Sequence, residues 1–342
     1  MRAVVIKLLL ALAALLSGCA TPPPPPLATQ AVHLVWPSPP AEARLGHVQS
    51  FSRPEDLGIQ RGLLQRVVDF VFGAPQNRLI RPSAVIEDQG VIYVADPGAK
   101  GVHRFDRRSG RYALIHAEGD VALPSPVGLA WGEAGVAYVS DSALGAVFMI
   151  QPGADVATRL SLSPAPTQPT GLAVEPQQHH LLVVDTAQHC IHVYGPDGVL
   201  LRSLGRRGTG DGEFNFPTLL WRNPAGQLLV TDALNFRTQV LAADGRFMAK
   251  FGRVGDAGGD APRQKGVAAD QHGHVYTVDA LLSALQVFDA RGQLLLSIGG
   301  LGHEAGEFWL PMGLYIGADD MIYVADSYNQ RVQVFRYLGG PT

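Results

Sequence analysis

The sequence IYVADSYNQRVQVF, residues 322–335, is apolar before a short polar insert and alternates polar and apolar residues after it. Alternation with a period of two is typical of a β-strand that buries one face. The insert holds Asp326, Asn329 and Arg331, and Asp and Asn both favour tight turns. The stretch therefore predicts two strands joined by a turn, with the aspartate at the end of the first strand.

This phrase recurs along the chain, which indicates a repeat architecture. Five further copies lie upstream, and their aspartates are Asp96, Asp141, Asp185, Asp232 and Asp279. Successive aspartates are 45, 44, 47, 47 and 47 residues apart, a near-constant period that is typical of stacked structural repeats. Most copies follow a Pro-x-Gly step, as in SPVGLAW, QPTGLAV and LPMGLYI. Each repeat holds four short apolar runs between turn residues, which predicts four strands.

A four-stranded sheet of this size cannot bury both of its faces alone, whereas six sheets arranged radially can. The phrases YVADSYNQRVQVF, GTGDGEFNFP and LGHEAGEFWLPMGL resemble the NHL repeat, and the resemblance covers roughly residues 75–338. It is strongest in two repeats, which keep Asn235, Arg237, Asn329 and Arg331. It implies an all-β fold, a six-bladed β-propeller of four-stranded blades over residues 75–342.

The repeated polar residues are expected to hold the blades together. An aspartate at a strand end can accept backbone N–H bonds in the following turn. The asparagine tolerates an unusual turn backbone, and the arginine can reach a carboxylate or a carbonyl and tie strand to blade. A residue type that recurs in every repeat favours this structural role over a ring of catalytic aspartates.

The last repeat has no room for a fourth strand, so an N-terminal segment is expected to close the ring. ARLGHVQSF, residues 43–51, alternates like a strand, whereas LLQRVVDFVFG, residues 63–73, has its apolar residues at helical spacing. We favour the first as the closing strand and the second as a short amphipathic helix packed on the propeller. The reverse assignment remains open. Together they form a segment over residues 43–74.

The N-terminus resembles a bacterial lipoprotein signal. Two basic residues and a short apolar run precede Leu-Ser-Gly-Cys, which ends at Cys19. The resemblance implies a signal peptide over residues 1–18 and lipid on the Cys19 thiol. Ala20 after the cysteine implies the outer membrane, facing the periplasm, of a Gram-negative source. The Pro-rich segment 19–42 is expected to be a stiff tether, rising about 3 Å per residue.

Charge and cysteine content exclude several classes of protein. The formal net charge is −3, with no large basic cluster, so no nucleic-acid partner is expected. The chain has two cysteines, and lipid on Cys19 would leave Cys190 without a partner for a disulfide. Cys190 stands where two other repeats have arginine, and we interpret it as a strand residue.

The NHL-type resemblance also raises an enzymatic alternative, a calcium-dependent lactonase or a zinc-dependent amidoglycolate lyase. Such sites need oxygen or imidazole ligands from several blades at one mouth of the channel. The residues expected there are Ser83, Val127, Thr170, Thr218, Lys265 and Met312, and the next ring is Pro97, Ser142, Thr186, Ala233, Ala280 and Ser327. Neither ring makes a metal cage, so no cofactor and no catalytic residue are predicted. A zinc site from His180, His189 and His274 is a weaker hypothesis.

We therefore expect a lipid-anchored binding scaffold rather than an enzyme. Specificity in such a disc resides in its loops, and the partner would be a protein, a peptide or a glycan. The long loops 206–216, 253–265 and 301–310 are Gly-rich, and the aromatic contact candidates are Phe214, Phe216, Phe308 and Trp309. For these aromatics we nevertheless favour the interpretation that they pack between blades.

Overall fold

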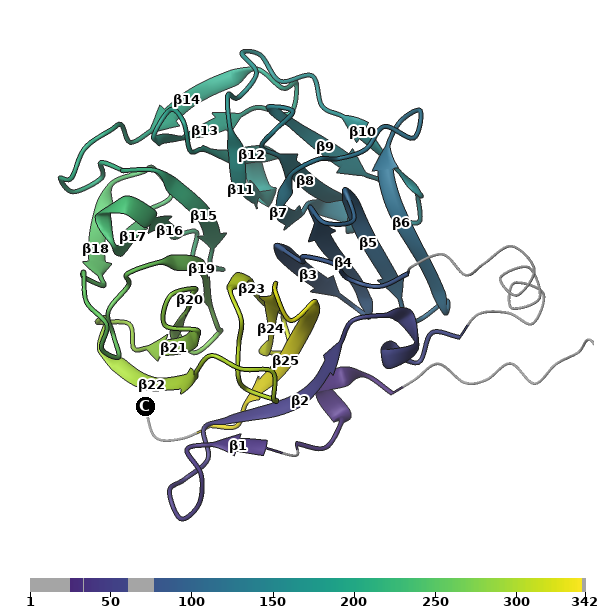
Figure 1. Cartoon of the computed structure of the whole chain (residues 1–342). Helices are drawn as coiled ribbons and strands as arrows, with labels where there is room; N and C mark the ends of the chain where they lie inside the picture. Colours follow the sequence, from purple (N-terminus) through teal and green to yellow (C-terminus); the bar gives the residue numbers. More distant parts are fainter. Residues whose placement is uncertain (1–24, 33, 61–76, 340–342) are drawn as a thin grey trace, which may run out of the picture.

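The computed structural model describes residues 25–32, 34–60 and 77–339. Within these ranges nearly all regular structure is β-strand, arranged as consecutive antiparallel meanders around a central axis (Figure 1). Each meander begins with a strand beside the axis and proceeds outward to the perimeter. The molecule is therefore an all-β propeller, as the repeat period predicts.

Three repeats form separate four-stranded sheets, each in simple meander order. The first sheet comprises β11 (Pro169–Glu175), β12 (His180–Asp185), β13 (Cys190–Tyr194) and β14 (Leu200–Leu204). The second comprises β15 (Pro217–Arg222), β16 (Leu228–Asp232), β17 (Arg237–Leu241) and β18 (Phe247–Phe251). The third comprises β19 (Gln264–Ala269), β20 (Val275–Asp279), β21 (Ala284–Phe288) and β22 (Leu294–Gly299).

Two further meanders are joined into one eight-stranded sheet. One consists of β3 (Ala84–Asp88), β4 (Val91–Asp96), β5 (Gly101–Asp106) and β6 (Arg111–Ala117). The other consists of β7 (Pro126–Trp131), β8 (Ala137–Asp141), β9 (Ala146–Ile150) and β10 (Val156–Arg159). The join is a short parallel pairing of β6 with β10, in which Val156 faces His116 and Ala157 faces Ala117.

The last sheet combines strands from both ends of the chain. Its order is β1 (Leu34–Trp36), β2 (Leu45–Phe51), β25 (Arg331–Tyr337), β24 (Met321–Asp326) and β23 (Pro311–Ile316). The strand expected in residues 43–51 is thus present as β2, and it pairs antiparallel with β25 from Leu45 opposite Tyr337 to Phe51 opposite Val332. The helix expected over 63–73 and the signal over 1–18 with Cys19 lie outside the described residues.

Part of the segment expected to be a free tether lies against the propeller. Leu27 is buried in the core, and residues 34–36 form β1 on the outer edge of β2. Trp36 packs against Phe335 of β25 with ring centroids 5.9 Å apart. The sequence does not reveal this contact, because LVW is too short to stand out as a strand signal between QAVH and PSPP.

Short 3-10 turns are the only helical elements of the described residues. They are η1 (Leu27–Thr29), η2 (Pro54–Leu57), η3 (Glu133–Gly135), η4 (Pro176–Gln178) and η5 (Ala233–Asn235). None of the described helices has the length and the apolar character needed to cross a membrane.

The innermost strands explain the repeated Pro-x-Gly step. In the described part of the chain β3, β7, β11, β15, β19 and β23 contact one another in that order, and β23 contacts β3 again. A Cβ at Gly128 would overlap the Thr170 carbonyl of the next inner strand, and a Cβ at Gly313 would overlap Ser83. Glycine is therefore required there because neighbouring backbones approach too closely for a side chain.

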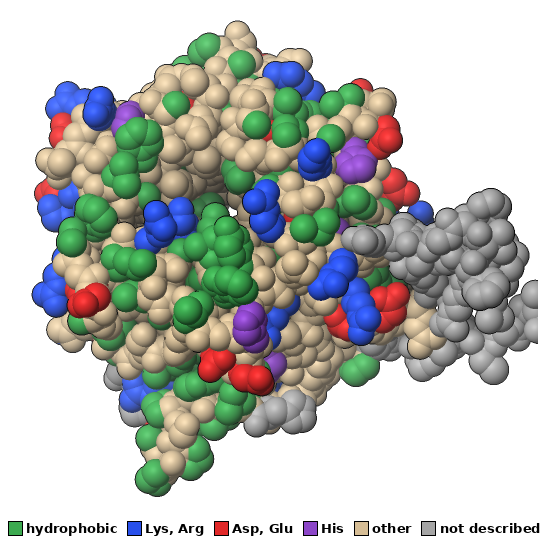
Figure 2. All heavy atoms as spheres, in the orientation of Figure 1, with side chains coloured by type: hydrophobic (Ala, Val, Ile, Leu, Met, Phe, Trp, Pro, Cys, Tyr) green, Lys and Arg blue, Asp and Glu red, His purple; other side chains and the backbone are tan. Residues whose placement is uncertain are grey.

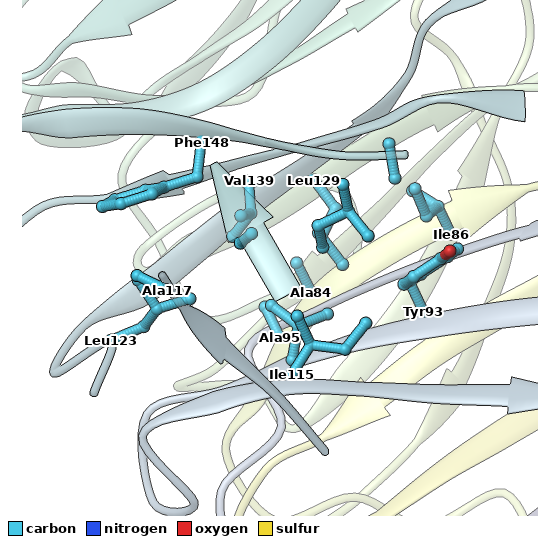
Figure 3. Packing of buried hydrophobic residues seen from close by; sticks show 14 of the residues in the cluster. Ala84, Ile86, Tyr93, Ala95, Ile115, Ala117, Leu123, Leu129, Val139 and Phe148 are labelled. Carbon is cyan, nitrogen blue, oxygen red and sulfur yellow. The ribbon is translucent and has the colours of Figure 1, made fainter. Parts of the chain in front are cut away.

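Apolar side chains fill the spaces between neighbouring meanders. Figure 3 shows one such cluster, in which Tyr93 and Ile115 face Leu129, Val139 and Phe148 of the next meander. Most of these side chains are fully buried. Burial between sheets rather than within one sheet makes each repeat depend on its neighbours for stability.

Candidate functional site

The six repeated aspartates are all fully buried in the described structure. Asp326 shows the complete arrangement: its carboxylate accepts hydrogen bonds from the backbone N–H of Trp309 at 2.8 Å and from Asn329, Arg331 and Gln333 side chains at 2.8, 2.8 and 3.1 Å. Each aspartate thereby joins the loop that precedes its repeat to the turn that follows its second strand. Each of these carboxylates accepts at least three hydrogen bonds, so its oxygens are occupied by nearby donors.

Arginine extends this network into the loop before the repeat. The Arg237 guanidinium donates to Asp232 at 2.8 Å and to the carbonyls of Thr209, Gly210 and Glu213 at 3.0, 2.7 and 3.0 Å. Arg331 makes the same set of bonds in its own loop. Each arginine therefore links its strand to the carbonyls of the preceding loop, 206–216 or 301–310.

The asparagine acts differently from the sequence expectation. The left-handed turn residue is Phe236 in one repeat and Gln330 in the other, each with φ of 55°. Asn235 instead donates its amide to Asp232 at 2.8 Å and to the Gly208 carbonyl at 2.9 Å. Its function is therefore to supply a hydrogen-bond donor rather than to relieve backbone strain.

Two repeats that lack the arginine place a histidine beside the aspartate. His103 and His192 stand seven residues after Asp96 and Asp185, the position that Gln239 occupies in its repeat. Their Nε2 atoms lie 3.4 Å and 3.7 Å from the aspartate oxygens. The imidazole thus replaces the missing guanidinium as a buried partner, a compensation that becomes visible only after the repeats are aligned on their aspartates.

The contact between Asp185 and His192 shifts the pKa of both side chains. Burial alone would raise the pKa of Asp185, but the contact with His192 and three backbone N–H bonds lower it below its usual value. The Asp185 carboxylate, followed by the Cys190 thiol, raises the pKa of His192 to about 9. The imidazole is therefore positively charged at neutral pH and stabilises the buried carboxylate.

We expect this pair to make stability fall at alkaline pH. The folded-state pKa of His192, about 9, lies above the 6.5 of a free histidine, so the contact stabilises fully below about pH 6.5 and is lost as pH rises through about 9. Between about pH 6.5 and 9.5 the chain should lose about 1–2 kcal/mol more unfolding free energy than a His192→Gln variant. Both proteins would keep Cys190, because its contact helps to raise the pKa of His192, and urea unfolding would be followed at each pH. Equal losses in the two proteins would contradict the ion pair.

Small polar residues at the mouth of the channel tie neighbouring inner strands together. Ser83 donates to the carbonyls of Ala95 and Pro126, at 3.1 and 2.8 Å. Thr186 lies 2.8 Å from the hydroxyl of Thr170 and donates to the Pro217 carbonyl at 2.6 Å. These hydroxyls belong to the scaffold, since their donors are used by backbone carbonyls of the next repeat.

Lys265 is the charged residue among the six positions expected to line the mouth of the channel. Burial lowers the pKa of its ammonium group, neighbouring Arg263 lowers it further, and Asp279 partly opposes both. No hydrogen bond or ion pair joins the Lys265 side chain to another described residue. A partly buried lysine without a partner is costly and marks a place where an anionic group would be favoured. Sequence reasoning placed Lys265 at the mouth but gave it no function, although it is the one charged residue among the six ring positions.

Large apolar side chains are exposed around the turns that follow the repeated aspartates, which we call the Asp turns. We call them the turn-face hydrophobic set: Leu144, Phe216, Leu234, Leu281, Trp309 and Tyr328. Their exposed fractions run from 37% for Leu144 to 63% for Leu281. Figure 2 shows hydrophobic side chains gathered beside the central opening, with basic side chains on its rim. Large apolar side chains exposed at the same turn of several repeats are candidates for contact with a partner.

The four predicted aromatic contacts divide into two pairs. Phe214 and Phe308 are fully buried and pack among core side chains, so they cannot contact a partner in this structure. Phe216 is 38% exposed and Trp309 is 42% exposed. Trp309 packs edge-on against Tyr328 with centroids 5.5 Å apart. The repeat explains the division, because each loop buries its first aromatic and exposes the second.

The histidines proposed for zinc do not come together. His180 pairs with Glu175, His189 accepts from the backbone N–H of Phe216, and His274 pairs with Asp270. Each of the three lies in its own local contact. Over the described ranges no group of three or more His, Cys, Asp or Glu side chains is placed to hold a metal ion.

Comparison with known proteins supports the fold. The NHL repeat family model matches residues 308–335. No curated protein sequence matches the chain. Among solved structures, virginiamycin B lyase from Staphylococcus aureus is 12% identical with a TM-score of 0.55, over 75% of this chain and 95% of that one.

Two further structures are similar to the same degree. A putative gluconolactonase is 14% identical with a TM-score of 0.57, over 76% of this chain and 89% of that one. An auxiliary nutrient binding protein from Bacteroides ovatus is 13% identical with a TM-score of 0.58, over 76% of this chain and 70% of that one. These likenesses show a shared β-propeller architecture.

Proposed function

We propose that this chain is a lipid-anchored binding scaffold of the bacterial envelope, whose Asp-turn face docks a protein or peptide partner. The observations that carry the proposal are the exposed side chains of the turn-face hydrophobic set and the partly buried Lys265 near the Asp279 turn. Exposed Trp, Tyr and Phe side chains are anchors that protein interfaces bury, and the Lys265 ammonium group would favour an acidic group on the partner. A glycan stacked on Trp309 is the other partner class that such a surface fits.

The scaffold is proposed to be a six-bladed propeller. Support comes from the contact order of the inner strands, which returns from β23 to β3. The eight-stranded sheet counts as two blades in this proposal, because only two residue pairs join its halves. The strand β2 supplies the fourth strand of the last blade and leaves β25 without a free edge.

The anchor is proposed from the sequence around Cys19. Lipid on that thiol would place the propeller at a membrane, with the Pro-rich segment before Pro25 as the spacer. Ala20 supports the outer membrane and the periplasmic side. Rigid loops fit this role, because the arginine networks pre-organise the face that would meet a partner.

A metal-dependent lactonase or an amidoglycolate-lyase-like enzyme is the alternative. Either would need several carboxylate or imidazole groups at one mouth of the channel. The six mouth positions hold Ser, Val, Thr, Thr, Lys and Met, and this chemistry favours docking over metal binding.

Site-specific photo-cross-linking in cells that make the full chain tests the proposal. A photoreactive residue at Leu281 or at Trp309 should give one shared adduct, and the same residue at Leu201, 53% exposed on β14, should give none. Lys265→Met should reduce the adduct several-fold, because it removes the charge and keeps the bulk. Cys19→Ala should move the chain from the membrane fraction to the soluble fraction. Equal adducts from all three positions would refute the docking face, and an unchanged membrane fraction would refute the anchor.

A further inference from the structure

The N-terminal segment joins the propeller at the end opposite to the Asp turns. The Arg107 side chain donates through Nη2 to the backbone carbonyl of Pro25, at 2.6 Å. Arg107 directly follows β5, which starts beside the Asp96 turn and ends opposite the first residue of β4. The backbone N–H of Arg107 also donates to the Gly90 carbonyl, in the turn between β3 and β4, at 3.0 Å. The described chain therefore enters the body among turns that lie away from the Asp turns.

Buried contacts fix this entry point. Arg107 is 5% exposed, and its Nε donates to the Leu57 carbonyl at 3.5 Å. A buried guanidinium is costly without acceptors, so it ties the two segments that supply them to the end of β5. Leu27 is buried in the same apolar cluster as Met321, the first residue of β24 and thus the end of that strand away from Asp326. The segment is consequently attached to the body before it reaches β1.

The lead between Cys19 and this attachment is short. Cys19 and Pro25 are six positions apart in the sequence. Because a chain extends by at most about 3.6 Å per residue, a lipid on Cys19 would lie within about 22 Å of Pro25. The six residues of β5 span about 20 Å, which separates Arg107 from the Asp96 turn. To bring the Asp turns to the bilayer, the lead would have to use its whole length along the side of the body.

We infer that the attachment at Arg107 and Leu27 orients the propeller on its membrane. The turn after β5 lies nearest to the lipid, and the Asp-turn face points away from the anchoring bilayer. This inference rests on the anchor and the docking face proposed above. It defines the partner further, as a protein or peptide that meets the turn-face hydrophobic set and Lys265 from the aqueous side, rather than one embedded in the same bilayer.

Energy transfer to a membrane acceptor tests the orientation. The full chain, purified with its lipid, is placed in vesicles of phosphatidylethanolamine and phosphatidylglycerol that carry an acceptor on the headgroups. A genetically encoded fluorescent residue replaces Ser109, in the turn after β5, or Lys100, in the Asp turn before it, and both positions are exposed. Transfer from the Ser109 position should exceed transfer from the Lys100 position at least about twofold, because the length of β5 separates them by about 20 Å.

Variants of the attachment test its cause. Arg107→Met keeps the bulk but cannot donate to the Pro25 carbonyl, so it should free the segment as far as β1 and bring the transfer ratio close to one. The matched control is Arg108→Met, in the same turn. Arg108 is exposed and lies 3.8 Å from Asp106, and its loss should leave the ratio unchanged.

Equal transfer from the two labels, or greater transfer from the Lys100 position, would overturn the inference. An unchanged ratio in Arg107→Met would do the same for the role of the attachment. If Arg107→Met does not fold, as judged by its thermal unfolding, Leu27→Asp replaces it, because a buried carboxylate is costly and should expel the segment. Failure of the anchor itself has a separate sign, the absence of vesicle binding. Failure of the docking face would abolish the cross-linked adduct but not the difference in transfer.

Discussion

Replacing Asp232 by alanine should lower the free energy of unfolding by about 3–5 kcal/mol, because it leaves the buried guanidinium of Arg237 without its counter-ion. Arg237 is 7% exposed, and Asp232 is fully buried. Asn235 and Gln239 would lose the same acceptor, since both donate to the Asp232 carboxylate, at 2.8 and 3.0 Å. Urea unfolding, followed by circular dichroism, measures the change.

The matched control is Asp279→Ala. Asp279 is equally buried but accepts only backbone N–H bonds, from Arg263, Leu281 and Leu282. Lys265 is near enough to feel the charge of Asp279 but does not donate to it, whereas Arg237 donates to Asp232. Loss of the Asp279 carboxylate should cost about 1–3 kcal/mol. If the two variants lose the same stability, the arginine network contributes nothing beyond the turn itself. Asp232→Ala should also free the loop 206–216, which would appear as faster proteolysis within that loop.

Replacing Phe51 by alanine should cost about 3–5 kcal/mol, the range for truncating a buried aromatic residue. Phe51 ends β2 and is 1% exposed. Its ring packs edge-on against Phe105 of β5 with centroids 5.6 Å apart. The side chain thus joins the last sheet to the first meander, and its loss should open the ring at that junction. Thermal unfolding of the variant measures the loss.

Leu34→Ala serves as the comparison for Phe51→Ala. Leu34 lies on β1 of the same sheet but is 41% exposed, so its truncation should change stability by less than about 0.5 kcal/mol. Similar unfolding midpoints for both variants would mean that the junction between β2 and β5 does not limit stability. A Phe51→Leu variant should recover part of the loss, because it refills most of the volume.

The sequence predicts the architecture well because the same local pattern occurs six times. The spacing of Asp96 through Asp326 indicates the repeat, and the alternation in residues 43–51 indicates the strand that pairs with β25. Period-two patterning and turn residues are local signals. Single repeats depart from the pattern, but the six repeats compared together show it clearly. The register of the paired strands also follows, because a shift by one residue would expose the buried face.

The candidate site could be predicted only in part. Burial depends on which neighbour a side chain meets, so the sequence could not separate Phe214, which is buried, from Phe216, which is exposed. The partial burial of Lys265 and the gathering of Trp131, Trp221 and Tyr315 around one cavity arise from strands more than 40 residues apart that meet at the channel. Such convergence has no local sequence signature.

The placement of β1 also determines how the protein would respond to a mechanical load on its N-terminal segment. A pull would reach the three residue pairs between β1 and β2 before it reached the ladder between β2 and β25. Trp36, packed on Phe335, lies at the far end of that short strand from the pulling point. β1 can therefore detach from β2 and lengthen the N-terminal segment while β2 stays paired with β25. Under load, β1 would give way before that ladder and so protect the pairing that closes the ring.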